Sequence, residues 1–304
     1  MTTWTSKTNR KVDLNSTKEL EASLGEAVNI VSSQQRAVEI ILEALDSTRY
    51  VTIVVLPISS PEWLLHAVLR SKATPAFVDD RADMHAAVHE IGSCVVVLYS
   101  EFGEPIPQDD LDLTRECVTI EISPDLPPQG KIKTTFGVYD LAPAMTTGAA
   151  LVTSFEDQHT LVKTALWRSG DVVSPYESAM ALTLLKSRDQ RAKEIAEIAK
   201  RYDHCCERSA LVSALNSKDV VRYFPVLVNN AAYVQSYLLG NGINSFLTKN
   251  SLSLLPYVQP FLNRTFPISE LCSNKYLLLP TSIHTDVVPF IVDLVKSVEE
   301  LESK

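Results

Sequence analysis

The chain has 304 residues, 45% hydrophobic and 21% charged, with a mean hydropathy of +0.04, which is typical of a soluble globular protein. The sequence has no run of roughly 18 apolar residues that could span a membrane, and its start, MTTWTSKTNRKVDL, lacks an apolar secretory signal, so we expect a cytoplasmic protein. A net charge of −9 without a Lys/Arg cluster argues against a nucleic-acid partner.

The first half of the chain alternates short apolar strands with helices. Ser32 and Ser33 offer an N-cap for the next helix, whose apolar residues repeat at helical spacing. YVTIVVLP is a β-branched run closed by Pro57, as in a buried parallel strand. This alternation predicts an α/β fold on a mostly parallel sheet. We expect helices at residues 16–24, 37–45, 61–71, 84–91 and 157–168, and strands at residues 28–32, 50–57, 75–78, 94–99, 117–122 and 149–153.

A change in composition near residue 190 predicts a domain boundary. One long amphipathic helix is expected from Tyr176 to about Arg208, with a charged face that we interpret as solvated. The sequence predicts a large α/β domain at 1–190 and a smaller C-terminal α+β domain at 191–304. In the second domain we expect strands at residues 222–228 and 276–279 and helices at residues 231–239 and 285–301.

Common signatures of nucleotide, disulfide or metal sites are missing. The nine glycines allow neither GxGxxG nor GxxxxGK[ST], and the five cysteines show no CxxC spacing. His85 and His89 stand four residues apart without a third ligand at a recognised spacing, so we expect no metal site. Cys205 and Cys206 are adjacent, and because adjacent helical residues do not face each other, we interpret them as small hydrophobic residues.

Several stretches occur in the order and spacing of one enzyme family. They are LEASLGEAVNIVSSQQRAVEIILEAL, VVLPISSPEWLLHAVLRSKATPAFVDD, VTIEIS, TTFGVYDLAPAMTTGAALVTS, YESAMALTLLKSRDQRAKEIAEIAKRYD and the C-terminal part from YFPVLVNNAAYVQSYLLGNG onward. Together they resemble the DegT/DnrJ/StrS-type sugar aminotransferases, fold type I enzymes that use pyridoxal phosphate to aminate keto-sugars attached to a nucleotide. The resemblance implies a fold type I large domain and a dimer with active sites at the subunit interface.

The lysine that this chemistry requires is missing. Aminotransfer needs a lysine that forms a Schiff base with pyridoxal, a role that no other side chain fills. The stretch that resembles the family's lysine segment, residues 140–147, contains Pro143 and no lysine. Lys133 and Lys163 lie outside it. We therefore expect no bound pyridoxal phosphate.

Three further cofactor contacts are changed. The resemblance implies an Asp that keeps the pyridinium nitrogen protonated, and Ile122 stands there. It implies Ser-Gly-Thr at a helix N-terminus for the phosphate, but Gln34-Gln35 replace the Gly-Thr pair. It also implies an aromatic residue in the loop that reads PISSP here. The degenerate positions of the implied cofactor site are Ser33, Gln34, Gln35, Pro61, Ile122, Asp125 and Pro143.

Some residues could still line a ligand pocket. Ser178 falls on the segment that the resemblance places near the substrate mouth, although it could instead cap the long helix. Residues 79–81, Asp-Asp-Arg, close a strand at its carboxyl end, where parallel sheets bind ligands, but we favour a helix-start or turn role. The residues of the candidate ligand pocket are Ser33, Asp125, Tyr139, Tyr176 and Ser178.

Four changes with four separate physical roles predict a non-catalytic homologue, or pseudoenzyme, that acts as partner or regulatory subunit of a pathway enzyme in amino-sugar or related secondary metabolism. We expect a homodimer or a hetero-oligomer with an active aminotransferase-like or pathway enzyme, with residues 63–69 and 145–149 at the interface. The alternative is a pyridoxal-independent enzyme or a sensor that binds a nucleotide-sugar-like metabolite in the vacated pocket. No nucleic-acid or membrane partner is expected.

Overall fold

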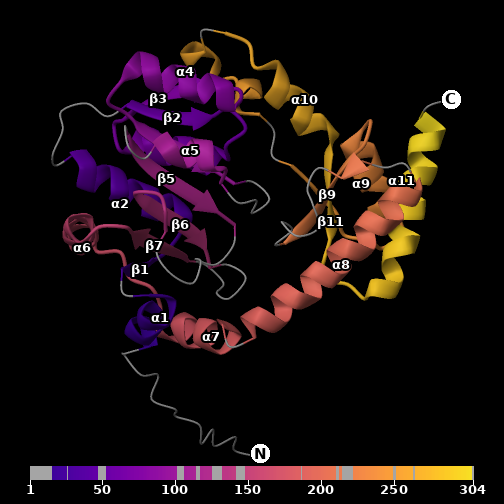
Figure 1. The fold of residues 1–304 in the computed structure, drawn as a ribbon, viewed down its shortest axis with the longest axis horizontal. Helices are drawn as coiled ribbons and strands as arrows, with labels where there is room; N and C mark the ends of the chain where they lie inside the picture. Colours follow the sequence, from indigo (N-terminus) through magenta and orange to yellow (C-terminus); the bar gives the residue numbers. More distant parts are fainter. Residues whose placement is uncertain are drawn as a thin grey trace, which may run out of the picture.

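The computed structural model describes most of the chain as two sheets with their helices (Figure 1). The described residues are 16–25, 27–46, 53–100, 106–113, 117–124, 132–141, 148–185, 187–209, 212–213, 222–248, 251–262 and 264–302. Asp125, Pro143 and the rest of the implied lysine segment at 142–147 lie outside them. Across this described part, no helix is both long enough and apolar enough to cross a membrane.

Among the described residues, seven strands form the larger sheet in the order β1-β7-β6-β5-β4-β2-β3. The strands from β2 to β6 are parallel, and β7 runs antiparallel to β6 and β1, so the predicted mostly parallel α/β sheet is confirmed. The strand β6 was not predicted, because Gly137 and Asp140 interrupt its apolar run. The strands are β1 (Val28–Val31), β2 (Ile53–Pro57), β3 (Thr74–Val78), β4 (Val95–Tyr99), β5 (Val118–Ser123), β6 (Phe136–Asp140) and β7 (Ala149–Thr153).

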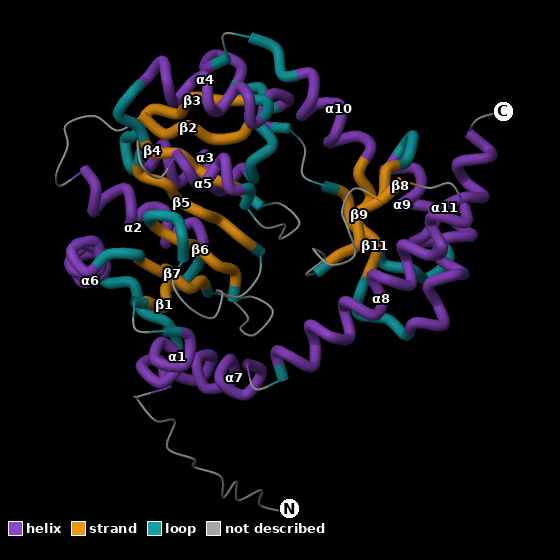
Figure 2. The backbone as a smooth tube through the Cα atoms, viewed as in Figure 1, coloured by secondary structure: helices purple, strands orange, loops and turns teal. Residues whose placement is uncertain are grey.

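Helices cover both faces of this sheet (Figures 1 and 2). On one face, Ile41 of α2, Leu65 of α3 and Val162 of α6 belong to the main core. On the other face, α1 and α7 cover the β1 side of the sheet and α4 the β3 side, with Leu20 and Met84 in two separate clusters. The helices are α1 (Ser16–Leu24), α2 (Gln34–Asp46), α3 (Glu62–Arg70), α4 (Arg81–Ile91), α5 (Gln108–Asp112), α6 (Glu156–Ser169) and α7 (Pro175–Leu185).

The smaller sheet has four described strands in the order β10-β11-β9-β8, all antiparallel. Its core packs against α8, α9 and α11, and the rings of Tyr202 and Phe224 stack at 4.9 Å between centroids. The single helix predicted from Tyr176 to about Arg208 is wrong, since α7 ends at Leu185 before α8 begins. The elements are α8 (Arg188–Ser209), β8 (Val212–Ser213), β9 (Tyr223–Leu227), α9 (Ala231–Gly240), β10 (Phe246–Leu247), β11 (Tyr276–Pro280), η5 (Thr285–Val287) and α11 (Val288–Glu302).

A segment late in the chain returns to the larger sheet before the last strand. It contains the 3₁₀ turns η3 (Leu252–Leu254) and η4 (Gln259–Phe261) and the helix α10 (Pro267–Lys275), which lies at the top of Figure 1. Leu252 N–H donates to the Ile58 carbonyl at 2.8 Å, and the Asp79 carboxylate accepts from the backbone N–H of Ile268 and Ser269 at 3.0 and 2.8 Å. Because Leu252 also belongs to the main core, that core draws on residues from both sides of position 190.

Candidate functional site

The N-terminus of α2 is capped by its own sequence. Ser33 Oγ accepts from the Arg36 N–H at 3.1 Å, so Ser33 satisfies one of the free N–H groups of the first turn, as the sequence predicted for a serine at this point. Ser32 donates twice to Asp171, from its N–H at 2.8 Å and from its hydroxyl at 2.6 Å. The Gln35 side-chain amide donates to Glu39 Oε1, one turn further along the helix, at 3.1 Å. These polar groups at the helix start are therefore engaged inside the chain.

Gln34 joins the start of α2 to the end of β5. Its side-chain amide donates to the Ser123 carbonyl at 3.1 Å. The neighbouring residue on β5, Ile122, is 0% exposed and lies in the main core, where it offers no polar atom to a ligand. The structure thus brings Ser33, Gln34 and Ile122 to the same carboxyl edge of the sheet, through a contact between residues 89 positions apart in sequence.

The opposite face of β5 carries a half-buried carboxylate, that of Glu121. Glu121 Oε2 accepts from the Thr134 hydroxyl at 3.2 Å, and burial raises the pKa of Glu121 above its ordinary value. Tyr139 on β6 is buried in the cluster beneath α1 and α7. Burial, together with the nearby charge of Glu121, raises the pKa of Tyr139. Both groups therefore favour their protonated forms, and the buried Tyr139 hydroxyl makes no hydrogen bond within the described part of the chain.

The other described candidate pocket residues, Ser178 and Tyr176, lie on α7. Ser178 is buried at the contact between α7 and α1, where its hydroxyl lies 2.9 Å from the Thr17 hydroxyl and donates to the Ser174 carbonyl at 3.2 Å. It lies inside the first turns of α7, so it is not the N-cap that the alternative interpretation expected. Tyr176, two residues earlier, is 61% exposed. Pro61 is the N-cap residue of α3 and makes no side-chain cap hydrogen bond.

The contacts and burial of the histidine and cysteine pairs are those of residues with a structural role. His85 Nε2 lies 3.1 Å from Asp110 Oδ1, while His89 is exposed. No cluster of three or more His, Cys, Asp or Glu residues able to hold a metal ion occurs in the described part of the chain. Cys206 is buried in the core of the smaller sheet, and burial raises the pKa of its thiol to about 12. An inert, protonated thiol agrees with the interpretation of this residue as a small hydrophobic one.

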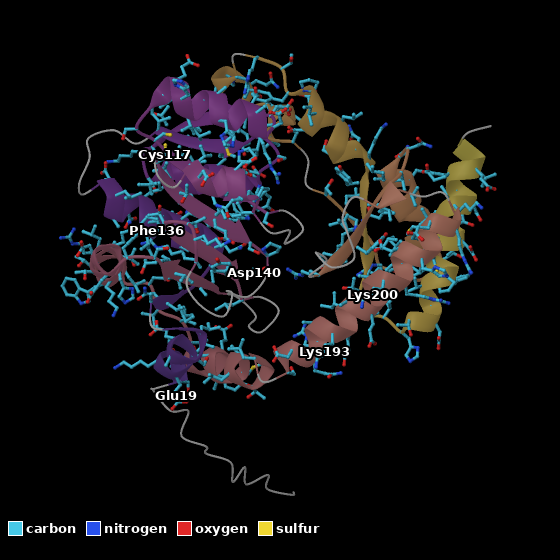
Figure 3. All side chains as sticks on the ribbon, in the orientation of Figure 1. Glu19, Cys117, Phe136, Asp140, Lys193 and Lys200 are labelled. Carbon is cyan, nitrogen blue, oxygen red and sulfur yellow. The ribbon has the colours of Figure 1, made fainter. Side chains whose placement is uncertain are left out.

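One ion pair at the carboxyl edge links the two sheets. Asp140, at the end of β6, lies on the side of the larger sheet that faces the smaller one (Figure 3), and its Oδ2 is 3.3 Å from Nη1 of Arg222. Sequence reasoning did not find Arg222, nor Asp171 beside Ser32. Neither residue stands in a motif, and each becomes a partner only when segments distant in sequence are brought together.

Comparisons with known proteins support the fold. No family model matches the sequence, and no curated protein matches it. Among solved structures, Helicobacter pylori PseC, an aminotransferase involved in the biosynthesis of pseudoaminic acid, superposes with a TM-score of 0.79 at 16% identity, covering 96% of this chain and 92% of PseC.

Two further solved structures give the same result. A DegT DnrJ EryC1 StrS aminotransferase from Brucella abortus has a TM-score of 0.78 at 16% identity, covering 95% of this chain and 90% of its own. The PLP form of Spr1654 from Streptococcus pneumoniae has a TM-score of 0.74 at 17% identity, covering 94% and 91%. The chain therefore has the fold of the DegT-type sugar aminotransferases, as its sequence led us to expect.

Proposed function

We propose that this chain is a non-catalytic homologue of the sugar aminotransferases, which holds no pyridoxal phosphate and acts as partner or regulatory subunit of a pathway enzyme. The observation that carries the proposal is the Gln34–Ser123 hydrogen bond of 3.1 Å. It joins the helix start that would hold the cofactor phosphate to the strand end that would hold the ring nitrogen. A side chain thus spans the gap between two elements that would both need to face a cofactor.

The described residues at this edge fit pyridoxal phosphate poorly. A protonated ring nitrogen needs a carboxylate partner, and the buried Ile122 side chain has no atom that can accept its proton. A phosphate at a helix start needs close approach to backbone N–H groups, and the side chain of Gln34 stands where the implied glycine would leave space. The sequence also lacks a lysine between Phe136 and Gly148.

Exposed apolar side chains support the proposed association with a partner subunit. Trp167 on α6 is 83% exposed, and Phe155, Val172, Tyr176 and Met180 in the same part of the chain are exposed as well. Large aromatic side chains are enriched at the centre of protein–protein interfaces. Of residues 63–69, which we also expect at the interface, Leu64, Leu65, Ala67 and Val68 lie within the main core, and Trp63 and Leu69 are only partly buried against it.

The cofactor part of the proposal is tested by absorbance and reduction. Purified protein is incubated with stoichiometric pyridoxal phosphate, scanned near the aldimine band, reduced with borohydride and digested for mass spectrometry. We expect no aldimine absorbance and no modified lysine, whereas Spr1654, which has a solved PLP form, serves as the positive control. A reducible adduct at one lysine of the folded protein would overturn the proposal.

The partner part is tested by sedimentation and co-purification from the native source. We expect a dimer or a hetero-oligomer that Trp167→Asp weakens, because a buried charge opposes association. Phe290→Asp is the matched control, since Phe290 is 53% exposed but lies on α11, on the smaller sheet. A monomer at micromolar concentration with no co-purifying partner would contradict the proposal, as would equal effects of the two substitutions.

A further inference from the structure

Two cysteines meet at the amino ends of neighbouring strands in the larger sheet. Cys94 precedes β4 and Cys117 precedes β5. Because these strands are parallel with Val95 opposite Val118, the two cysteines occupy the preceding pair of facing positions in the same register. Their sulfurs lie 3.4 Å apart, and both residues are free thiols. Two residues 23 positions apart in sequence are thus in direct sulfur–sulfur contact.

The contact is buried on the α4 face of the sheet. Cys94 is 2% exposed and Cys117 is 8% exposed, and both belong to the cluster that contains Val88 of α4 and Val96 of β4. The Cys117 thiol also donates to the Gly92 carbonyl at 3.4 Å. Figure 3 shows Cys117 on the side of the larger sheet away from the smaller sheet. The two thiols are therefore held together by the packing of α4, β4 and β5.

The backbone geometry at this position suits a covalent link. Neighbouring strands lie about 4.8 Å apart, and disulfides join residues whose Cα atoms are about 4.4–6.8 Å apart. Facing residues on two parallel strands direct their side chains to the same face of the sheet. The sulfurs need to approach from 3.4 Å to a bond length of about 2.05 Å, which rotation of the two side chains supplies while the strands stay paired.

We propose that Cys94 and Cys117 form a modification site, at which hydrogen peroxide oxidises the two thiols to a disulfide that links β4 to β5. The peroxide first converts the Cys117 thiol to a sulfenic acid and is itself reduced to water. The Cys94 sulfur then attacks the Cys117 sulfur, and the sulfur–sulfur bond forms. The hydroxyl group leaves with the proton of the Cys94 thiol as a second water. A dithiol reductant returns both thiols by disulfide exchange.

The surroundings of the two thiols assign their roles. Cys117 is the more exposed of the two, so it is the thiol that the oxidant reaches first. Burial, together with the hydrogen bond to Cys117, raises the pKa of the Cys94 thiol to about 12. Because a protonated thiol is a poor nucleophile, Cys94 reacts only with the sulfenic acid held next to it. A small peroxide is the expected oxidant, since a bulky disulfide would have to enter the packed cluster.

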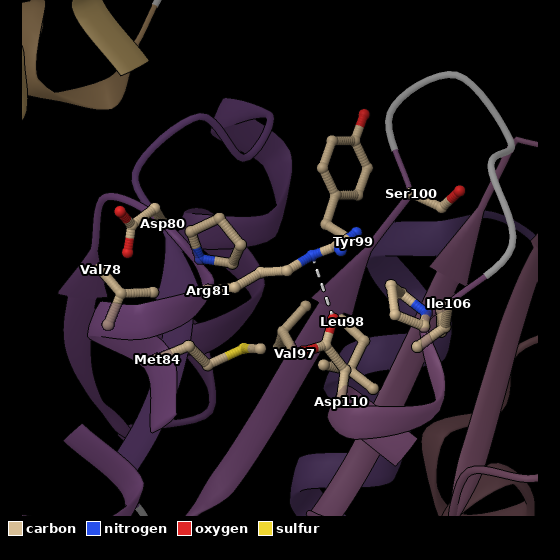
Figure 4. A pocket seen from close by; sticks show the side chains of 12 residues that line it. Val78, Asp80, Arg81, Met84, Val97, Leu98, Tyr99, Ser100, Ile106 and Asp110 are labelled. Atoms are coloured by element: carbon tan, nitrogen blue, oxygen red, sulfur yellow. Dashed lines mark ion pairs between the residues drawn. The ribbon is translucent and has the colours of Figure 1, made fainter. Parts of the chain in front are cut away.

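The cysteine pair lies at the opposite end of the strands from the implied cofactor site. A cavity that Pro57 and Leu98 line lies at the carboxyl ends of β2 and β4 (Figure 4). There the Asp80 carboxylate accepts from the Asp83 N–H at 2.8 Å and caps α4, which is the helix-start role that we favoured for residues 79–81. The cysteine pair shares no residue with that edge of the sheet. The proposed oxidation therefore stands or falls independently of the proposed loss of the cofactor.

Peptide mapping of the full chain tests the proposal. Reduced protein is treated with hydrogen peroxide, denatured in iodoacetamide and digested for mass spectrometry. We expect the peptides that contain Cys94 and Cys117 to be joined with the loss of two hydrogen atoms, and dithiothreitol to separate them. Alkylation of both cysteines as in untreated protein would overturn the site. A link from either one to a different cysteine would also overturn it, as would further oxidation of Cys117 without a link.

Variants assign the order of the two steps. In Cys94→Ala the sulfenic acid has no resolving thiol, so we expect dimedone to label Cys117, and absence of that label would overturn the assigned order. Cys117→Ala, at the more exposed position, should fold even if Cys94→Ala does not, and should show no link. Cys205→Ala is the matched control, since Cys205 is half-buried on α8 of the smaller sheet and should leave the link intact.

Thermal unfolding tests whether the native geometry accepts the bond. A disulfide between Cys94 and Cys117 constrains the unfolded chain, so peroxide should raise the thermal midpoint of the unchanged protein, and dithiothreitol should reverse the rise. Peroxide should leave the midpoint of Cys117→Ala unchanged. A linked protein with a lower midpoint than the reduced one would show a strained bond, and it would overturn the proposal that the fold holds these thiols ready to link.

Discussion

Replacing Ile122 by Asp restores the carboxylate that the family resemblance implies, and it tests whether the end of β5 is a cofactor site or core. The Ile122 side chain is 0% exposed and shares the main core with Ile120 and Val138. Removing a buried aliphatic side chain costs about 2–5 kcal/mol. Placing an unpaired carboxyl group there adds at least about 2 kcal/mol more. Because total stabilities are about 5–15 kcal/mol, we expect Ile122→Asp to be severely destabilised at neutral pH.

The pH dependence gives the direction of the effect. Burial would raise the pKa of the introduced carboxyl above the ordinary Asp value of about 3.9, so its neutral form is favoured in the folded state. The variant therefore keeps more of its stability near or below about pH 4, and loses about 1.4 kcal/mol per pH unit as the pH rises toward the folded-state pKa. Ile122→Asn, which has a side chain of the same size without a titrating group, should show a pH-independent loss relative to the unchanged protein.

Urea unfolding of the three proteins between about pH 4 and pH 8 measures these differences as free energies of unfolding. An Ile122→Asp variant as stable as the unchanged protein, with the same pH dependence, would refute the reasoning. It would mean that position 122 faces a solvated polar site, and the proposal of a vacated cofactor site would lose its support.

Other positions give independent predictions. A Cβ added at Gly137 would lie 2.4 Å from Cε2 of Tyr139, so Gly137→Ala should lower the free energy of unfolding by about 1–3 kcal/mol in urea titrations, and unchanged stability would contradict the packing. Burial raises the pKa of Cys94 to about 12, so iodoacetamide should label this thiol only after denaturation. Rapid labelling of Cys94 in the native protein, detected by mass spectrometry, would instead show a reactive thiolate. The Arg222–Asp140 ion pair is partly exposed, so a double-mutant cycle with Arg222→Gln and Asp140→Asn should give a coupling of no more than about 1 kcal/mol, and a much larger value would show a pair shielded from solvent.

Local sequence patterns were sufficient to predict most strands and helices of the larger sheet. The β-branched run that ends at Pro57 predicted β2, and helical periodicity after Ser33 predicted α2 together with its cap. These signals are local because alternation, periodicity and capping all operate within a few residues. The identity of the residues at the implied cofactor site is likewise a property of the sequence, since Ile122 and Gln34 can be read from it directly.

Local sequence patterns failed to predict elements whose structure depends on the strands and helices they pair or pack with. The strand β6 contains a glycine and ends in an aspartate, so its sequence does not resemble a buried strand, yet β5 and β7 pair with it along its length. The charged run around residue 186 continues a helical pattern, and only the structure separates α7, which packs on α1, from α8, which packs on α11.

The sequence by itself determined most of the strands and helices of the larger sheet, their order along the chain, and which residues stand at the positions of the implied cofactor site. Tertiary structure decided that Gln34 reaches Ser123 and that Asp110 meets Arg81 and His85 from a different helix. The physical reason is that hydrogen bonds and ion pairs depend on distances of a few ångströms between groups far apart in the chain. Those distances are set by how the sheet and its helices pack together, which no local pattern encodes.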